Sequence, residues 1–249
     1  MKKSVVIIPT YNEKENIVLL LQKIFSLSIP LDVIIIDDNS PDGTAELVRN
    51  LQDKYPEKLH LEVRAEKLGL GTAYIHGFKV ALNMGYEYIF EMDADFSHNP
   101  HDLKRLYFTC VKNNYDVSIG SRYVKGVNVV NWPMGRVLMS YCASIYVKFI
   151  TGMDISDTTA GFVCYHRKVL ETINLDKIRF IGYAFQIEMK FLAWKHGFRI
   201  KEVPIIFTDR TKGTSKMSKG IFREAIFGVI KIKIGSLFTN YKAIANRSV

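Results

Sequence analysis

The chain has 249 residues, 48% of them hydrophobic, which is enough to bury a substantial core and excludes a disordered chain. Its net charge of +9 is concentrated near the C-terminal end, because residues 199–249 carry 11 Lys and Arg against 3 Asp and Glu. This asymmetry favours a local anionic partner over a uniformly basic protein. Three widely spaced cysteines fit reduced thiols and exclude a disulfide scaffold.

The N-terminal residues and the hydropathy argue against export and membrane spanning. Lys2 and Lys3 precede only a short apolar stretch, which is unlike a signal peptide. No stretch approaches the ~20 uninterrupted apolar residues that a spanning helix needs. We therefore expect a cytoplasmic protein without transmembrane helices.

The first half of the chain alternates buried strands with helices. Strands are predicted at residues 4–8, 33–36, 60–63 and 88–92, each a run of apolar and β-branched residues. We expect Pro9 to stop the first strand and Thr10 or Asn12 to cap the helix after it. Two further helices are expected after Gly43 and Gly69. This alternation predicts an α/β fold with a mostly parallel sheet covered on both faces.

The second half is less regular. Extended segments are predicted at 116–120, 161–165, 200–203 and 205–208, and helices at 134–150 and 183–196. We expect residues 1–219 to form one domain and 220–249 a basic amphipathic C-terminal segment. Its apolar residues recur at helical spacing, with Lys231 and Lys233 among them, which favours a helix lying in a membrane interface. A helix packed on the core is the alternative.

Polar clusters follow three of the predicted strands, at residues 9–13, 37–40 and 93–95. The carboxyl ends of parallel strands meet at one edge of a sheet, where ligands bind. Carboxylates crowded at one edge repel one another unless a cation offsets them. Their hard oxygen atoms favour Mg²⁺ or Mn²⁺ bridging to phosphates, and no Cys/His cluster offers a zinc site.

Known phosphate-binding loops do not fit the chain. Gly69 and Gly71 lie at a strand-to-helix turn, but the third glycine of a dinucleotide fingerprint would fall at Tyr74. The Gly-Lys-Ser/Thr of a P-loop is absent from the sequence. A nucleotide is therefore expected to be held in another way.

Four motifs together resemble the family 2 glycosyltransferases, which have a GT-A, Rossmann-like fold. They are VIIPTYNE at 6–13, DDNSPDGT at 37–44, KLGLGTA at 67–73 and MDADFSH at 92–98. With GSRY at 120–123, they resemble the polyprenyl (dolichyl) phosphate mannose synthases within that family. The resemblance implies transfer of one mannose, with inversion, from GDP-mannose to a polyprenyl phosphate, using a divalent metal at the cytoplasmic face of a membrane. It also allows a small membrane-anchoring subunit.

The resemblance also assigns residues by motif position. The nucleotide base and ribose would border Pro9, Tyr11, Glu13 and Asp38. The diphosphate would meet Asp93, Ala94 and Asp95, and the metal Asp93, Asp95 and Ser97. The acceptor phosphate would bind Arg122, Arg136, Ser140 and Arg210, with Lys216 in a mobile acceptor loop. The residues with catalytic roles would be Asp95, Arg122 and Arg136.

The proposed chemistry can be argued from the reactants themselves. A divalent ion on Asp95 would neutralise the leaving diphosphate. A phosphate monoester needs no general base, because its second pKa is near ~6, but it needs cations such as the forks of Arg122 and Arg136. His98 is expected to support the acidic cluster rather than act as a base. Gln186 and Glu188 point in different directions on a helix, so only one of them is expected to face the sugar.

Three alternatives remain open from the sequence. The same fold could use UDP-glucose or another nucleotide sugar with a polyprenyl phosphate. The pI of about 9.3 also fits a nucleic-acid-binding protein, although the acidic edge would repel phosphates without a metal. A noncatalytic subunit that binds a nucleotide sugar is the third, and the paired aspartates argue against it.

Overall fold

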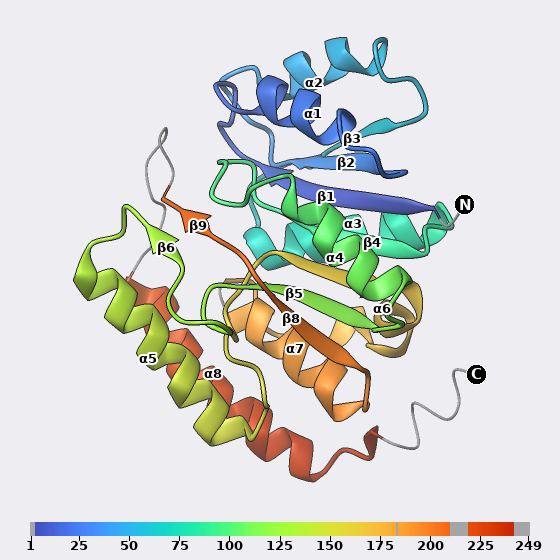
Figure 1. Cartoon of the computed structure of the whole chain (residues 1–249). Helices are drawn as coiled ribbons and strands as arrows, with labels where there is room; N and C mark the ends of the chain where they lie inside the picture. Colours follow the sequence, from blue (N-terminus) through green and yellow to red (C-terminus); the bar gives the residue numbers. More distant parts are fainter. Residues whose placement is uncertain (1–2, 183, 210–218, 242–249) are drawn as a thin grey trace.

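Strand β1 (Ser4–Thr10) lies inside a seven-stranded sheet. The structure is a computed structural model, and it describes residues 3–182, 184–209 and 219–241. The strand order is β3 (Leu59–Val63), β2 (Asp32–Asp37), β1, β4 (Tyr88–Glu91), β7 (Val163–His166), β5 (Val117–Ser121) and β8 (Ile200–Pro204). All neighbours are parallel except β7, which is antiparallel to β4 and β5 (Figure 1). The predicted α/β fold with a mostly parallel sheet is confirmed.

Alternating residues of each strand serve two apolar clusters, one on each face of the sheet. Val5 and Ile7 pack with α3 (Leu70–Asn83), α6 (Arg167–Thr172) and α7 (Ala184–Lys195). Val6 and Ile8 pack with the helices of the other face, α1 (Ile17–Phe25), α2 (Thr44–Gln52) and α4 (Asp102–Val111). This alternation explains why the strands read as continuous apolar runs, since both of their faces are buried.

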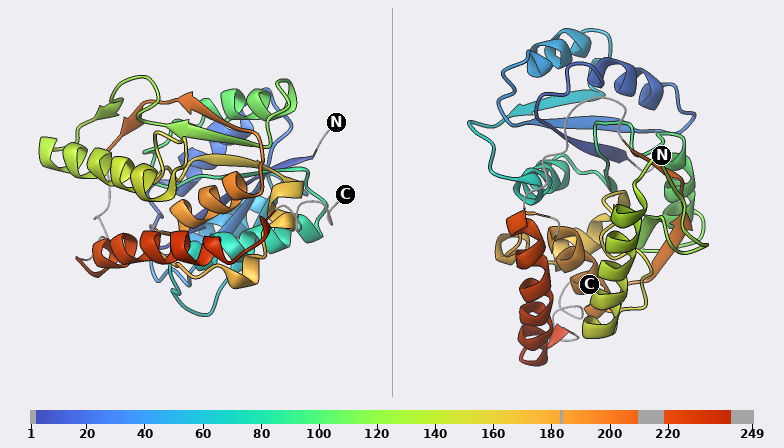
Figure 2. Two further views of the ribbon diagram at one scale, coloured as in Figure 1. Left: turned by 90° about the horizontal axis from the view of Figure 1, so that it is seen from below. Right: turned by 90° about the vertical axis from the view of Figure 1, so that its left-hand side faces the viewer.

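Two long helices lie beside this core. Helices α5 (Met134–Thr151) and α8 (Lys219–Leu237) run next to each other, and α8 also packs on α7 (Figures 1 and 2). A short sheet of β6 (Val129–Val130) and β9 (Phe207–Thr208) lies near the start of α5 (Figure 1). Within the described residues, no helix combines the length and apolarity needed to cross a membrane. The division at residues 219 and 220 stays a prediction.

The structure corrects the expected end of the first strand. Strand β1 continues through Pro9, which pairs with Ile36 of β2, to Thr10. Pro9 is tolerated because the ladder with β4 ends at Ile7 and Glu91, so no neighbour on that side requires its missing N–H. The expected cap is also wrong, because α1 begins after Asn16, and the Thr10 hydroxyl donates to Asp37 Oδ2 at 2.7 Å instead.

Two helices were not predicted from the sequence. Helix α4 buries Leu103, Leu106, Tyr107 and Cys110, which lie at helical spacing, so its pattern is present in the sequence. Helix α6 has only six residues, too few for a periodic pattern to identify it. Helix α4 covers the sheet between β4 and β5, directly after the acidic motif at residues 93–95.

Candidate active site

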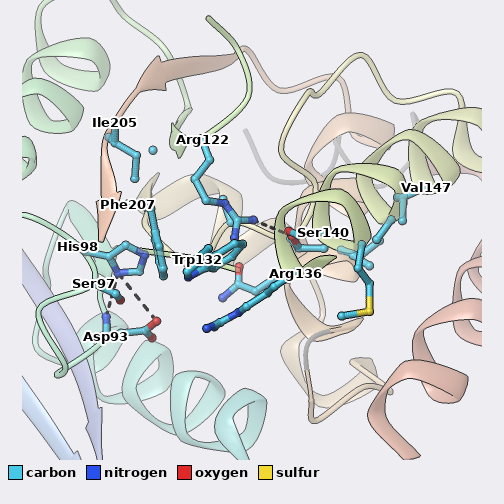
Figure 3. A pocket seen from close by; sticks show the side chains of 18 of the residues that line it. Asp93, Ser97, His98, Arg122, Trp132, Arg136, Ser140, Val147, Ile205 and Phe207 are labelled. Carbon is cyan, nitrogen blue, oxygen red and sulfur yellow. Dashed lines mark hydrogen bonds and ion pairs between the residues drawn. The ribbon is translucent and has the colours of Figure 1, made fainter. Parts of the chain in front are cut away.

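A cavity of about 430 Å³ lies at the carboxyl ends of β4 and β5, beside α5. Many of the residues singled out in the sequence line it, namely Asp93, Asp95, Ser97, His98, Arg122, Arg136, Ser140 and Gln186. Figure 3 shows Asp93, Ser97 and His98 on one side and Ser140 and Val147 on the other, with both arginines between them. The fold therefore brings together residues that are far apart in the sequence.

One side of the cavity is the turn at residues 93–98, here called the carboxylate turn. The Ser97 N–H donates to Asp95 Oδ1 at 3.0 Å, and the Asp93 N–H donates to His98 Nδ1 at 3.3 Å. The Tyr74 hydroxyl of α3 donates to Asp93 Oδ1 at 3.3 Å. Backbone groups and a buried hydroxyl thus fix both carboxylates where β4 ends.

Phe96 gives the carboxylate turn its sharp reversal. Its φ of 62° lies in the left-handed region, which is unfavourable for a bulky residue and costs about 1–3 kcal/mol. The Phe96 ring packs against the apolar cluster on the face of α1, and Lys23 Nζ of α1 lies 5.0 Å from the ring centroid. Packing on that face therefore holds the strained residue.

His98 supports the turn, in the role expected from the sequence. It is buried, and its ring stacks on Phe162 with the centroids 4.8 Å apart. Burial lowers the pKa of His98 to about 4, so the ring is neutral at physiological pH. Because Nδ1 accepts the N–H of Asp93, the imidazole orders the backbone that carries the carboxylates.

The donor atoms of this turn fit a divalent ion that is shared with a substrate. Among the residues that the structure describes, no three His, Cys, Asp or Glu side chains gather to hold a metal by themselves. Asp93 and Asp95 both line the cavity, and the buried Ser97 Oγ has no hydrogen-bond partner within the described part of the chain. Mg²⁺ is commonly held by one or two carboxylates together with substrate phosphates, so this donor set is suitable.

Arg122, at the end of β5, lies within the cavity wall and is paired with a carboxylate that the sequence did not single out. Its Nε and one terminal nitrogen donate to the two oxygens of Asp157 at 2.7 and 2.6 Å, and the latter nitrogen also donates to Thr159 Oγ1 at 2.8 Å. Although burial alone would raise the pKa of Asp157, the charge and hydrogen bonds of Arg122 lower it. Arg122 is therefore held rigidly.

Arg136 and Ser140 reach the cavity from the first turns of α5. Arg136 donates to Asp209 Oδ1 at 2.9 Å, and its guanidinium lies 4.2 Å from the Trp132 ring centroid. Ser140 Oγ accepts the Tyr123 hydroxyl at 2.8 Å. The other two residues expected to bind the acceptor, Arg210 and Lys216, lie outside the described residues.

The residues expected around the base and ribose lie beyond this cavity. Pro9, Tyr11 and Glu13 are at the end of β1, and Asp38 follows β2. The two loops are joined, because the backbone N–H of Glu13 donates to Thr44 Oγ1 at 3.0 Å. None of these four side chains is among the described residues that line the cavity. The Ala94 methyl group packs in the core, and the expected contact of this residue with a diphosphate stays a prediction.

Two basic residues near the expected nucleotide site were not identified as site residues by the sequence analysis. Arg64, just after β3, contacts Asp38 Oδ1 at 2.6 Å and donates to Thr72 Oγ1 at 2.8 Å. Burial raises the pKa of Asp38, and Arg64 opposes that shift. Lys67 Nζ lies 4.3 Å from the Tyr11 ring centroid. Their only sequence signal is their place after a predicted strand, beside the glycine-rich turn.

Gln186 and Glu188 have different surroundings, as their spacing on α7 predicts. Gln186 lines the cavity. Glu188 Oε2 instead accepts the backbone N–H groups of Arg179 and Phe180 at 2.9 and 3.2 Å. Glu188 therefore fixes the segment before α7, and of these two residues only Gln186 faces the cavity.

Two solved structures have a similar fold. Glucosyl-3-phosphoglycerate synthase from Mycobacterium tuberculosis, in complex with Mn²⁺, UDP and glucosyl-3-phosphoglycerate, matches 96% of this chain and 81% of its own, with a TM-score of 0.65 and 14% identity. TarS residues 1–349 from S. aureus match 98% of this chain and 69% of their own, with a TM-score of 0.64 and 18% identity. At these identities the likeness shows the fold, and it confirms the GT-A architecture.

Sequence comparisons show much closer relatives. Polyprenol monophosphomannose synthase of Mycolicibacterium smegmatis is 44% identical over 228 residues, 92% of this chain and 86% of that protein. Undecaprenyl-phosphate mannosyltransferase of Micrococcus luteus is 41% identical over 237 residues, 95% of this chain and 96% of that protein. Residues 5–173 match the family model described as glycosyl transferase family 2. The chain therefore belongs to the glycosyl transferase family 2 enzymes.

Proposed function

We propose that the protein transfers one mannosyl group from GDP-mannose to a polyprenyl phosphate, with inversion at the sugar carbon. The observation that carries this proposal is one cavity lined by the carboxylates of Asp93 and Asp95 and by the guanidinium groups of Arg122 and Arg136. Figure 3 shows Asp93 on one side of both arginines. Such a site can hold a metal-bound diphosphate and a second phosphate next to each other. The names of the two close relatives, a polyprenol monophosphomannose synthase and an undecaprenyl-phosphate mannosyltransferase, support this choice.

On the donor side, Asp93, Asp95 and Ser97 would hold Mg²⁺ or Mn²⁺. A bound ion would neutralise the negative charge that develops on the leaving diphosphate. The carboxylate turn contributes rigidity, because the Ser97 N–H holds the Asp95 carboxylate and the Tyr74 hydroxyl holds the Asp93 carboxylate before a ligand arrives. Arg64 and Lys67 add positive charge near Asp38 and Tyr11, where the nucleotide would lie.

On the acceptor side, Arg122 and Arg136 would orient the phosphate of the lipid. A phosphate monoester is largely dianionic at neutral pH and is itself the nucleophile. This agrees with a site in which the buried imidazole of His98 already accepts a backbone N–H. Cations between the donor and the acceptor would direct a phosphate oxygen toward the sugar carbon from the side opposite the diphosphate, which inverts that carbon.

The lipid chain would leave the cavity along α5 and α8. The cavity lining continues from Arg136 into Met139, Tyr146, Val147 and Ile226. Beyond it, Phe149 of α5 and Phe227 of α8 are 83% and 66% exposed. We infer peripheral binding of these helices to the cytoplasmic face of a membrane, aided by the basic residues of the C-terminal segment.

The test is transfer of labelled sugar to a short polyprenyl phosphate, run separately with GDP-mannose, GDP-glucose, UDP-glucose and UDP-galactose. We expect turnover with GDP-mannose to exceed the others and to stop in chelator. A preference for a uridine nucleotide would replace the donor assignment and leave the acceptor assignment standing. Transfer to a sugar alcohol but not to the lipid phosphate would remove the acceptor assignment.

A further inference from the structure

A buried amide lies in the cavity wall, apart from the residues that the proposed function uses. Gln186 of α7 is 2% exposed, and its Nε2 donates to Glu91 Oε2 at 2.8 Å. Its Oε1 accepts from Lys190 Nζ at 3.1 Å. An ammonium group can only donate, so the amide oxygen must face Lys190 and the amide nitrogen must face Glu91. The orientation of the amide is therefore fixed.

Lys190 connects this amide to a second part of the cavity wall. Its Nζ also donates to the carbonyl oxygen of Ala160 at 2.6 Å, next to Gly161, and both of those residues line the cavity. Lys190 and Glu91 are charged groups that are both fully buried. Apolar residues would pack here at lower cost, which points to a role other than stability.

Gly161 keeps open the space in front of the amide. A Cβ atom at this position would lie 3.9 Å from Gln186 Nε2, 3.9 Å from His98 Cε1 and 4.0 Å from Asp93 Oδ2. These are ordinary contact distances, so an alanine would fit without displacing the protein. Its methyl group would, however, occupy the space between the amide and the carboxylate turn.

We propose that Gln186 recognises the transferred sugar, donating its second amide N–H to a ring hydroxyl in the space beside Gly161, and that Lys190 and Glu91 position this amide. Within the described part of the chain, the one hydrogen bond that Gln186 Nε2 donates is to Glu91, which leaves its second N–H available to a ligand. The inference rests on the proposed function for the presence of a nucleotide sugar. The space adjoins Asp93, so a hexose attached to a diphosphate on the carboxylate turn would reach it.

A neutral amide held by two buried partners suits discrimination between sugars that differ at one hydroxyl. A site built to hydrogen-bond a hydroxyl rejects a substrate that lacks it, because the buried polar group is then left unpaired. Gln186 would therefore contribute to the choice of sugar, and not to the binding of the nucleotide.

The test compares sugar-dependent with nucleotide-dependent properties in Gly161→Ala and Gln186→Glu. We expect kcat/KM for GDP-mannose to fall about tenfold or more, while the Kd for GDP with Mn²⁺ changes less than about twofold. The matched control is Gly235→Ala on α8, where an added Cβ meets no atom within 4 Å, and it should leave both values unchanged. Lys190→Met should narrow the preference for GDP-mannose over GDP-glucose, which a purely structural role would not do.

Two results would overturn the inference. One is unchanged kcat/KM in folded Gly161→Ala and Gln186→Glu. The other is an equal loss of GDP affinity and of donor turnover, which would indicate a structural role. If the wild-type protein does not use GDP-mannose, the proposed function fails instead, and the same ratios are then measured with the nucleotide sugar it uses and the corresponding nucleoside diphosphate.

Discussion

The two sides of the cavity hold their charged groups by different means. On the carboxylate turn, the Asp95 carboxylate accepts the Ser97 N–H, and the Asp93 carboxylate accepts the Tyr74 hydroxyl. Next to this turn, Arg122, directly after β5, and Arg136 of α5 are each held by a carboxylate, Asp157 or Asp209. The carboxylates of the turn are therefore held by neutral hydrogen-bond donors, and the arginines are held by ion pairs.

The donor side is prepared in advance, whereas Arg136 on the acceptor side can exchange its partner. A backbone N–H that binds Asp95 has few other positions to adopt. The Arg136–Asp209 pair is about a quarter exposed, with side-chain exposures of 27% and 25%, so an incoming phosphate can replace the carboxylate at little cost. We therefore expect changes to the carboxylate turn to abolish turnover, and changes around Arg136 to adjust it.

Replacing Asp95 with alanine should have the largest effect. Loss of a group that neutralises charge on the leaving diphosphate is expected to lower kcat by about 10²-fold or more. Circular dichroism should show a folded protein, and the exposed Asp53→Ala should retain wild-type activity. Near-normal turnover of Asp95→Ala in chelator-treated buffer would remove the carboxylate turn from the proposed donor side.

Replacing Arg122 with glutamine tests the more rigidly held of the two arginines. Its partner Asp157 would be left buried without a counter-ion, so the free energy of unfolding should fall by about 3 kcal/mol. Because the pKa of Asp157 is lowered in the folded protein, the pair contributes stability above the pKa of an unfolded aspartate, about 4, and loses it as the pH falls below that value.

Urea unfolding measured at several pH values checks this prediction. The difference between wild type and Arg122→Gln should shrink below about pH 4. The matched control is Arg105→Gln, whose pair with Asp102 is half-exposed on the arginine side and should cost at most about 0.5 kcal/mol. An equal loss of unfolding free energy in both variants would mean that the buried Arg122–Asp157 pair stabilises the fold no more than the more exposed Arg105–Asp102 pair does.

Arg136 and Asp209 should give changes of opposite sign. Arg136→Lys should raise the KM for the lipid phosphate about tenfold, because an ammonium cannot reproduce the planar fork. Asp209→Asn should lower that KM a few-fold, because it removes the carboxylate that competes with the phosphate. The Kd for GDP should stay constant in both variants, and a parallel change in GDP affinity would place Arg136 on the donor side.

The exposed apolar side chains of α5 and α8 should have the smallest individual effects. Phe149→Ser on α5 and Phe238→Ser directly after α8 remove rings that are 83% and 86% exposed, and each should weaken sedimentation with anionic vesicles several-fold. Leu19→Ser on α1, half-exposed but away from these helices, is the control. Removal of α8 is a poorer test, because Val229 is buried in the core. Unchanged sedimentation of both phenylalanine variants would contradict the proposed membrane surface.

Much of the fold could be predicted because it depends on local patterns. Apolar runs marked β1, β2 and β4, and helical spacing marked α5 and α7. The continuation of β1 through Pro9 could not be predicted, because it depends on β4 ending beside Ile7. The position of β7 between β4 and β5 is likewise a property of the assembled sheet.

For the site, the sequence identified groups but not their partners. Motif position identified Asp93, Asp95 and Arg122, and the cavity contains them. Asp157 lies 35 residues from Arg122, and nothing near it in the sequence marks it as a partner. The Lys190 contact with Ala160 spans 30 residues and needs α7 packed on the sheet before it exists. Partners of this kind become visible only in the folded chain.

The strained backbone at Phe96 makes the carboxylates depend on the far face of the sheet. The ring of this residue is anchored in the cluster beside α1, under the Lys23 ammonium, while its neighbours Asp95 and Ser97 face the cavity. Phe96 thus connects the packing on the α1 face of the sheet to the position of the two residues that flank it in the cavity. A glycine at this position would relieve the backbone strain, but it would also remove the ring that ties the turn to the α1 face of the sheet.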